Sequence, residues 1–190
     1  MLKDTIISAL EAYLVNDSKT ESKRRCKAGE FTYIPFCLDR FETQLKIVSG
    51  MLSASRVTDF RFVDVGCGIG TKVLVARESG FDAYGIEKSL RYVKVAKKLL
   101  EGYENKNWYP KKKDRIILGD ALRADYRLYD VIYFYRPFIN HEKQTALEKR
   151  IVAHAKEGAI VMANYKLVGE DFWSHKPMQR VWQNVIYRKM

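Results

Sequence analysis

Three glycines alternate with other residues directly after an apolar, strand-like run. The stretch at 61–72 reads RFVDVGCGIGTK, in which Asp64 precedes Gly66, Gly68 and Gly70. Glycine reaches positive φ without a steric penalty, and it lets a ligand approach the backbone closely. A glycine turn between a strand and a helix is typical of nucleotide-binding sites. The spacing therefore predicts a nucleotide-like ligand at this turn, with a bare structural turn as the alternative.

The same spacing argues against two common nucleotide classes. A dinucleotide fingerprint has glycine at its first, third and sixth positions, but the sixth position counted from Gly66 is Thr71, and counted from Gly68 it is Val73. A phosphate-binding Walker loop requires G-x-x-x-x-G-K followed by Ser or Thr, and the sequence contains no such string. Neither NAD nor a phosphate-loop nucleotide is expected.

Two further carboxylates follow the next strand-like runs. Glu87 closes the run FDAYGIE at 81–87, and Asp120 ends the run RIILGD at 115–120. Because parallel strands bring their carboxyl ends to one edge of a sheet, Asp64, Glu87 and Asp120 are expected at the same edge. A carboxylate accepts two hydroxyl hydrogen bonds at once. The alternatives are that Asp64 ties the loop, that Glu87 pairs with a neighbouring lysine and that Asp120 caps a turn.

The residues VDVGCGIG resemble motif I, D/E-x-G-x-G-x-G, of the class I S-adenosylmethionine (SAM)-dependent methyltransferases, and the likeness covers the order of elements from about 60 to 165. The resemblance implies an α/β, three-layer Rossmann-like fold with a mostly parallel central sheet, here with an N-terminal helical extension. It implies SAM as cofactor, with Glu87 receiving the ribose hydroxyls and Asp120 near the adenine. The cofactor-binding residues it implies are Asp64, Gly66, Cys67, Gly68, Gly70, Glu87, Lys88, Asp120 and Ala121.

The run VIYFYRPFIN at 131–140 corresponds to the floor that faces the methyl group in that family. Amine-methylating nucleic-acid enzymes of the family carry D/N-P-P-Y/F there, whereas this chain has Tyr135, Arg136, Pro137 and Phe138. Base-amine methylation is therefore not indicated. No cysteine lies near this strand, so carbon-5 pyrimidine methylation is not indicated either.

We expect Tyr135 and Arg136 to be the catalytic residues. The aromatic faces of Tyr133 and Tyr135 suit a sulfonium. Arg136 suits a carboxylate or a phosphate, because its guanidinium is forked and permanently charged. The alternative is that both tyrosines pack under a helix and that Arg136 is solvated.

The net charge of +11 favours polyanionic partners, and it is concentrated in runs such as 22–27 and 111–115. Solvated surface segments are the alternative. The upstream stretch at 31–52 is similar to that of the seven-strand protein-lysine methyltransferases, and an aromatic rim of Tyr33, Tyr135 and Phe138 suits a lysine stem. A macromolecular acceptor is therefore favoured, protein lysine ahead of RNA. A small-molecule methyltransferase and a non-catalytic SAM-binding module with a basic surface remain alternatives.

The pattern of apolar residues predicts elements along one domain over 1–190, with N-terminal helices and a substrate-side segment at 1–50 and a Rossmann-like core at 58–190. Residues 1–15 are expected to form an amphipathic helix and 16–30 a flexible link, and the segment 19–33 is expected to close over the acceptor side. The predicted strands are 60–65, 81–87, 115–120, 129–135 and 158–165, with a further strand-like run at 181–189. The predicted helices are 71–79, a helix from Ser89 with Leu90, Val93, Lys97 and Leu100 on one face, and 141–158.

Cysteine and histidine usage indicates neither disulfides nor a metal. Cys26, Cys37 and Cys67 are odd in number and lack C-x-x-C spacing. The three histidines, His141, His154 and His175, show no helical i, i+4 pairing and are read as non-ligands. The apolar runs are too short to cross a membrane, and the opening stretch does not have the pattern of a signal peptide. A cytoplasmic protein is expected.

Overall fold

The structure, a computed structural model, describes residues 37–52, 59–107, 115–169, 172–173, 177–183 and 185–190. Several predictions lie outside these residues. They are the helix over 1–15, the link over 16–30, the closure by 19–33, the basic run at 22–27 and the position of Tyr33.

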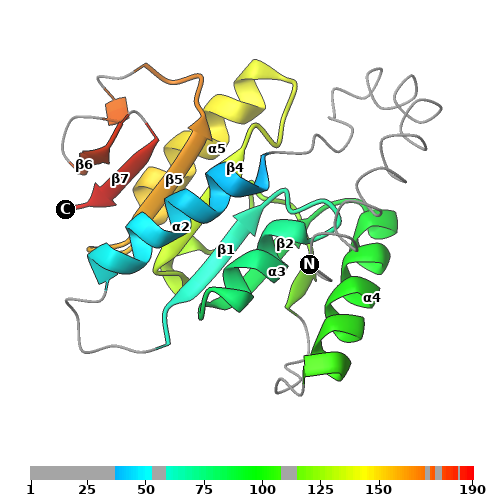
Figure 1. Cartoon of the computed structure of the whole chain (residues 1–190). Helices are drawn as coiled ribbons and strands as arrows, with labels where there is room; N and C mark the ends of the chain where they lie inside the picture. The colour runs from blue at the N-terminus through cyan, green and yellow to red at the C-terminus, as the bar shows by residue number, and fades with distance from the viewer. Residues whose placement is uncertain (1–36, 53–58, 108–114, 170–171, 174–176, 184) are drawn as a thin grey trace.

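The core of the molecule is a seven-stranded sheet with the order β3-β2-β1-β4-β5-β7-β6 (Figure 1). Five strands run parallel and β7 pairs antiparallel with both β5 and β6. The bounds are β1 Arg61–Val65, β2 Asp82–Glu87, β3 Ile116–Leu118, β4 Val131–Tyr135, β5 Ile160–Tyr165, β6 Met178–Trp182 and β7 Ile186–Lys189. The mostly parallel sheet is confirmed.

Helices cover both faces of the sheet, which gives the three layers that the sequence predicts. The helices are α2 Leu38–Leu52, α3 Thr71–Glu78, α4 Leu90–Asn107 and α5 His141–His154, with a short 3-10 helix, η1, at Tyr126–Leu128. Strand residues alternate between two cores: Phe62 and Tyr133 pack with α2, α3 and α4, whereas Val63 and Ile132 pack with α5 and η1. This alternation follows from the two-residue period of a strand buried on both faces.

The carboxyl-terminal strand prediction is wrong in one respect. Where a single strand was expected at 181–189, the chain forms a hairpin in which β6 and β7 pair through Trp182 and Ile186. Gln183 turns the chain with φ at +44°. Neither glycine nor proline marks that turn, so the run reads as continuous in sequence.

Two helix details also differ from expectation. The helix α5 ends at His154 rather than at Gly158, because Ala155 leaves the helical conformation, and Gly158 (φ +78°) lies in the turn to β5. In α4, Lys97 and Leu90 are exposed, and the buried residues are Tyr92, Val93, Ala96, Leu99 and Leu100.

Two side-chain amides, one on α2 and one on β5, hold α2 against the sheet. Gln44 Nε2 donates to Asn164 Oδ1 at 2.7 Å, and Asn164 Nδ2 donates back to Gln44 Oε1 at 2.9 Å. Gln44 is fully buried, and each amide satisfies the other's donor and acceptor. The helix is therefore held over the carboxyl end of β5.

None of the helices in the described part of the chain is both long and apolar enough to span a membrane.

Candidate functional site

The glycine turn joins β1 to α3, and all three of its glycines have positive φ. The angles are +78° at Gly66, +55° at Gly68 and +81° at Gly70. A Cβ at Gly66 would lie 2.7 Å from Pro137 Cβ, and one at Gly70 would lie 3.1 Å from Ala96 Cβ. Gly66 and Gly70 are thus required by the protein's own packing and backbone angles, in addition to any close approach of a ligand.

Neighbouring backbone groups fix the turn against β2. The amides of Gly66 and Cys67 both donate to the carbonyl of Ile86, at 2.9 and 3.0 Å. The side chain of Cys67 is buried over Gly85, where an added Cβ would lie 2.6 Å from Cys67 Sγ. Because that thiol faces the core, Cys67 can meet a ligand only through its main chain. Burial, reinforced by the charges of Asp64 and Glu87, raises the pKa of the Cys67 thiol well above its ordinary value.

Glu87 connects the glycine turn to the start of α4. Its Oε2 accepts the amide of Gly68 at 3.0 Å, and its Oε1 accepts the amide of Ser89 at 2.7 Å. A carboxylate has about four acceptor positions, so one carboxylate can hold backbone amides and also accept from hydroxyl groups. The carboxylate is half-buried, whereas the neighbouring Lys88 is exposed. The arrangement fits a group that offers two hydroxyl donors.

Asp64 is a buried acid under the turn. It lies on β1 between Gly85 of β2 and Tyr133 of β4, and it is 3% exposed. Burial raises the pKa of Asp64 to about 7, an effect that Lys72 opposes and Glu87 reinforces. A cationic ligand close to this carboxyl would favour its ionised form.

Hydrogen bonds shape the loop after β3. Asp120 Oδ1 accepts the amide of Leu122 at 2.9 Å, the turn cap that the sequence left open as an alternative. The Tyr126 hydroxyl donates to the carbonyl of Ala121 at 2.7 Å, and the Arg150 guanidinium donates to the carbonyl of Ala124. The loop is therefore held in place by its own residues and by α5.

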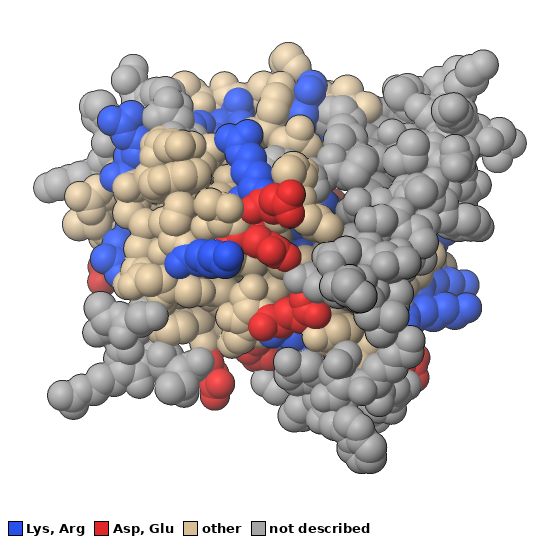
Figure 2. Space-filling model, viewed as in Figure 1, with Lys and Arg blue, Asp and Glu red and all other residues tan. Residues whose placement is uncertain are grey.

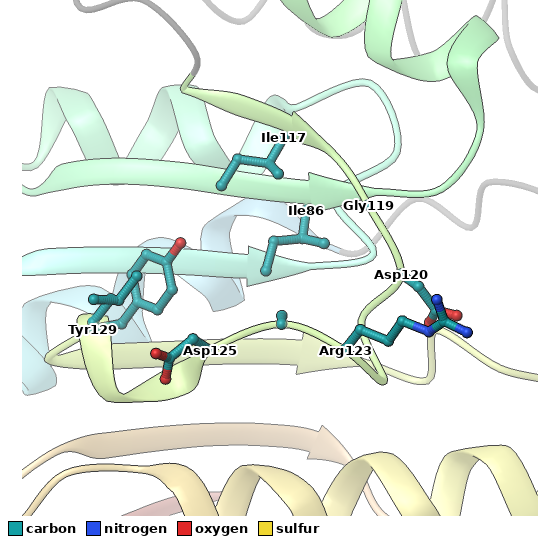
Figure 3. Close-up of a pocket in the computed structure, with 9 residues that line it drawn as sticks. Ile86, Ile117, Gly119, Asp120, Arg123, Asp125 and Tyr129 are labelled. Carbon is teal, nitrogen blue, oxygen red and sulfur yellow. The ribbon is translucent and has the colours of Figure 1, made fainter.

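A shallow cavity of about 250 Å³ opens beside this loop (Figure 3). Ile86, Ile117 and Tyr129 provide apolar walls, and Asp120 and Arg123 lie together at one end. The cavity reaches Asp120 at the same strand edge as the glycine turn. It offers a flat apolar surface next to a carboxylate.

At the end of β4, Arg136 adopts a left-handed backbone conformation with φ at +42°, uncommon for a residue with a side chain. Its guanidinium carbon lies 4.5 Å from the centre of the Tyr165 ring at the end of β5. The guanidinium is thus held against an aromatic ring rather than simply solvated. Tyr165 could not be identified from the sequence, because only the pairing of β4 with β5 brings it to Arg136.

The tyrosines of β4 do not both face a ligand. Tyr133 is 1% exposed, with its ring centre 4.9 Å from that of Phe41 on α2. The expectation that Tyr133 contacts a sulfonium is therefore wrong, because its ring packs in the core beneath α2. Tyr135 is half-buried against the same core, whereas Phe138 packs against the core on the opposite face. The structure does not bring Tyr135 and Phe138 together as a rim.

A buried carboxylate organises the loops after β4 and β5. Glu148 of α5 accepts the amides of Leu167 and Val168 and the indole N–H of Trp173, at 2.8, 3.0 and 3.2 Å. It also accepts Gln144 Nε2, and Gln144 Oε1 accepts the amide of Phe138 at 3.4 Å. In sequence Glu148 looks like an ordinary charge of a surface helix, so no signal identified it.

Within the described ranges, no group of three or more His, Cys, Asp or Glu side chains is placed to hold a metal ion. His141 and His154 lie at opposite ends of α5. His175 lies outside the described residues.

The order of the strands, the glycine turn after β1 and the acids at the same edge define the class I, Rossmann-like methyltransferase fold. No protein-family model matches the sequence, and no curated protein matches it. Solved structures do match the fold. The magnesium protoporphyrin IX methyltransferase from Synechocystis PCC 6803, with bound SAM, has a TM-score of 0.50 and 15% identity, and the match covers 98% of this chain and 94% of that one.

Two further solved structures match the fold of part of this chain. YjhP from E. coli has a TM-score of 0.50 and 22% identity, over 68% of this chain and 49% of that one. The SAM-bound amino pentose methyltransferase CalS10 from Micromonospora echinaspora has a TM-score of 0.47 and 18% identity, over 70% of this chain. The match covers 57% of the CalS10 chain, so this protein corresponds to little more than half of that enzyme.

Proposed function

We propose that the protein binds SAM at the carboxyl edge of β1, β2 and β3 and transfers its methyl group. The observation that supports this most is the bond from the Gly68 amide to Glu87, which joins the glycine turn of β1 to the acid that ends β2. A carboxylate at the end of β2 can accept hydrogen bonds from both hydroxyls of a ribose. The missing third glycine of a dinucleotide fingerprint argues against NAD.

In this proposal each predicted residue has a role. Glu87 accepts the ribose hydroxyls, and the main chain at Gly66, Cys67, Gly68 and Gly70 forms the wall behind the ligand. Asp120 and Ala121, with the apolar wall of the neighbouring cavity, hold the adenine. Asp64 supplies negative charge beneath a cationic ligand, and Lys88 flanks the ribose.

When bound, SAM supplies an activated methyl group on a sulfonium with a neutral leaving group. The protein then needs mainly to hold the acceptor atom in line with that bond and to exclude water. Tyr135 and Arg136 end β4 at the edge where open α/β sheets bind ligands. Tyr165 holds the Arg136 guanidinium at this edge, and the Glu148 network fixes the two loops beside it.

The charge of the protein and the position of Arg136 bear on the class of the methyl acceptor. The net charge of +11 favours a macromolecular acceptor. An Arg136 guanidinium at the strand edge suits a carboxylate or phosphate of that acceptor, or the carboxylate of SAM itself. A small-molecule acceptor is the alternative.

Turnover of methyl-labelled SAM on cell extract tests the activity. Label counted separately in the protein, RNA and small-molecule fractions assigns the acceptor. We expect label in a macromolecular fraction. Label confined to small molecules would overturn the acceptor proposal, and no label in any fraction would overturn the transferase proposal.

The substitution Arg136→Lys separates the two roles of that residue, because it keeps the charge and removes the fork. If Arg136 grips the acceptor, as we propose, turnover falls while SAM affinity is nearly unchanged. A parallel fall in turnover and SAM affinity would assign the residue to the cofactor instead. Unchanged values even in Arg136→Ala would exclude it from the site.

A further inference from the structure

The outer face of α4 carries a stripe of basic residues, named here the α4 stripe. Arg91, Lys94, Lys97 and Lys98 are all exposed, and Lys88, just ahead of the helix, is exposed as well. Because positions i, i+3 and i+7 share one side of a helix, Arg91, Lys94 and Lys98 form a line over about two turns. The opposite face is buried against the sheet, which fixes the direction in which the stripe points.

This charge pattern opposes the stability of the helix itself. The first turn of α4 contains no acid, although acidic side chains are the ones favoured there by the helix dipole. Lys94 and Lys98 are four residues apart and repel each other. From 88 to 101 the only acid is Glu101. Positive charge therefore outnumbers negative charge along this part of the helix.

The helix on the other face of the sheet shows the ordinary arrangement. In α5, Glu142 lies in the first turn and His154 in the last, as the helix dipole favours. Acidic and basic residues alternate along its sequence, HEKQTALEKRIVAH. The excess of positive charge on α4 is therefore not shared by α5.

The location of the stripe also suits an extended ligand. α4 begins three residues after Glu87, so the stripe starts at the edge that bears the candidate site and runs away from it along the helix (Figure 1). Basic side chains are visible at the right edge of Figure 2, where Figure 1 places α4.

From this charge and exposure we propose that the α4 stripe is a docking surface for the phosphate backbone of a nucleic acid. A line of basic side chains with few acids among them is complementary in charge to a nucleic-acid strand, which carries one negative phosphate at every nucleotide. Basic residues aligned along one helix face are the electrostatic pattern of such surfaces. The inference does not depend on methyl transfer, because Arg91, Lys94, Lys97 and Lys98 are not residues of the candidate site.

The test is binding of a fluorescein-labelled single-stranded RNA of about 20 nucleotides, followed by anisotropy between about 0.05 and 0.25 M KCl. The variant Lys94→Gln/Lys98→Gln removes two charges from the stripe. The matched control, Lys143→Gln/Lys149→Gln, removes two exposed lysines from α5. Both variants keep the basic runs at 22–27 and 111–115, so only the location of the lost charge differs.

We expect the stripe variant to bind about tenfold more weakly near 0.1 M KCl, with a plot of log K against log salt shallower by about 1.4. The control variant should lose at most about threefold. Equal losses in both variants, unchanged salt dependence in the stripe variant, or no RNA binding by the wild type would each overturn the proposal. Competition by polyglutamate as effective as that by unlabelled RNA would also overturn it, in favour of an acidic protein. Titration with S-adenosylhomocysteine, expected to be equal in all three proteins, reports separately on the proposed cofactor site.

Discussion

Gly66 illustrates how one residue can serve two purposes in a turn. Its φ of +78° disfavours any side chain, and Pro137 fills the space that a Cβ would occupy. Pro137 therefore closes the turn from the β4 side, in addition to ending β4. The packing couples the candidate cofactor turn to the candidate acceptor strand.

The substitution Gly66→Ala should consequently destabilise the protein more than the backbone angle alone would. Gly158→Ala is a matched control, because Gly158 also has φ at +78° but a Cβ added there would meet no atom within 4 Å. The left-handed conformation costs an alanine about 1–2 kcal/mol. We expect Gly66→Ala to lose at least about 1 kcal/mol more than the control in urea unfolding. Equal losses would show that Pro137 moves aside freely.

Asp64 should give the protein a distinct dependence of stability on pH. The pKa of this carboxyl rises from 3.8 to about 7 on folding. The folded state therefore holds a proton that the unfolded state releases, so this group destabilises the fold progressively as pH increases from about 4 to about 7. Above pH 7 the effect is constant.

Replacement by the neutral isostere, Asp64→Asn, removes this effect. The free energy of unfolding of the wild type, measured relative to that of the variant, should fall by a few kcal/mol between pH 5 and pH 8. Urea unfolding at the two pH values measures it. A difference that does not change with pH, or that grows in favour of the wild type, would contradict the raised pKa.

At the scale of elements, the pairing of α2 with β5 is the contact that no local pattern reveals. N-terminal helices were expected within 1–50 without exact bounds, and α2 forms at Leu38–Leu52. Its place on the sheet depends on the Gln44–Asn164 amide pair, whose members are 120 residues apart. Gln44 reads as a polar surface residue in sequence, yet it is fully buried.

This amide pair predicts a strong coupling between two substitutions. Gln44→Leu alone leaves the Asn164 amide without its buried partner and should cost about 1–3 kcal/mol. The double substitution Gln44→Leu/Asn164→Leu should be less destabilised than the sum of the two single variants. Thermal or urea unfolding of the four proteins gives the coupling. Additive losses would mean that the pair contributes nothing specific to holding α2.

Most elements could be predicted from sequence because each parallel strand is a short apolar run between glycine or polar breaks. The hairpin of β6 and β7 could not, since Gln183 supplies its positive φ without glycine. The edge position of Asp64, Glu87 and Asp120 was predictable, because sheet topology alone sets it. The contacts of Arg136 with Tyr165 and of Glu148 with the loop after β5 were not, because they depend on tertiary pairing.

At the scale of the whole molecule, the two functional proposals occupy adjoining parts of one edge. The glycine turn, Glu87 and Asp120 lie where β1, β2 and β3 end, and the α4 stripe begins just beyond Glu87. A positively charged face beside a candidate cofactor site would bring an anionic macromolecule to that edge and speed its association at low salt.

Calorimetric titration tests directly whether this edge binds SAM. We expect the wild-type protein to bind SAM and S-adenosylhomocysteine and not to bind NAD. Glu87→Ala, which removes two charge-assisted acceptors, should weaken SAM binding by about 100-fold or more, whereas Glu101→Ala on the exposed face of α4 should not change it. Circular dichroism of each variant establishes that it is folded. Binding of NAD in preference to SAM, or an unchanged SAM affinity in folded Glu87→Ala, would contradict the account.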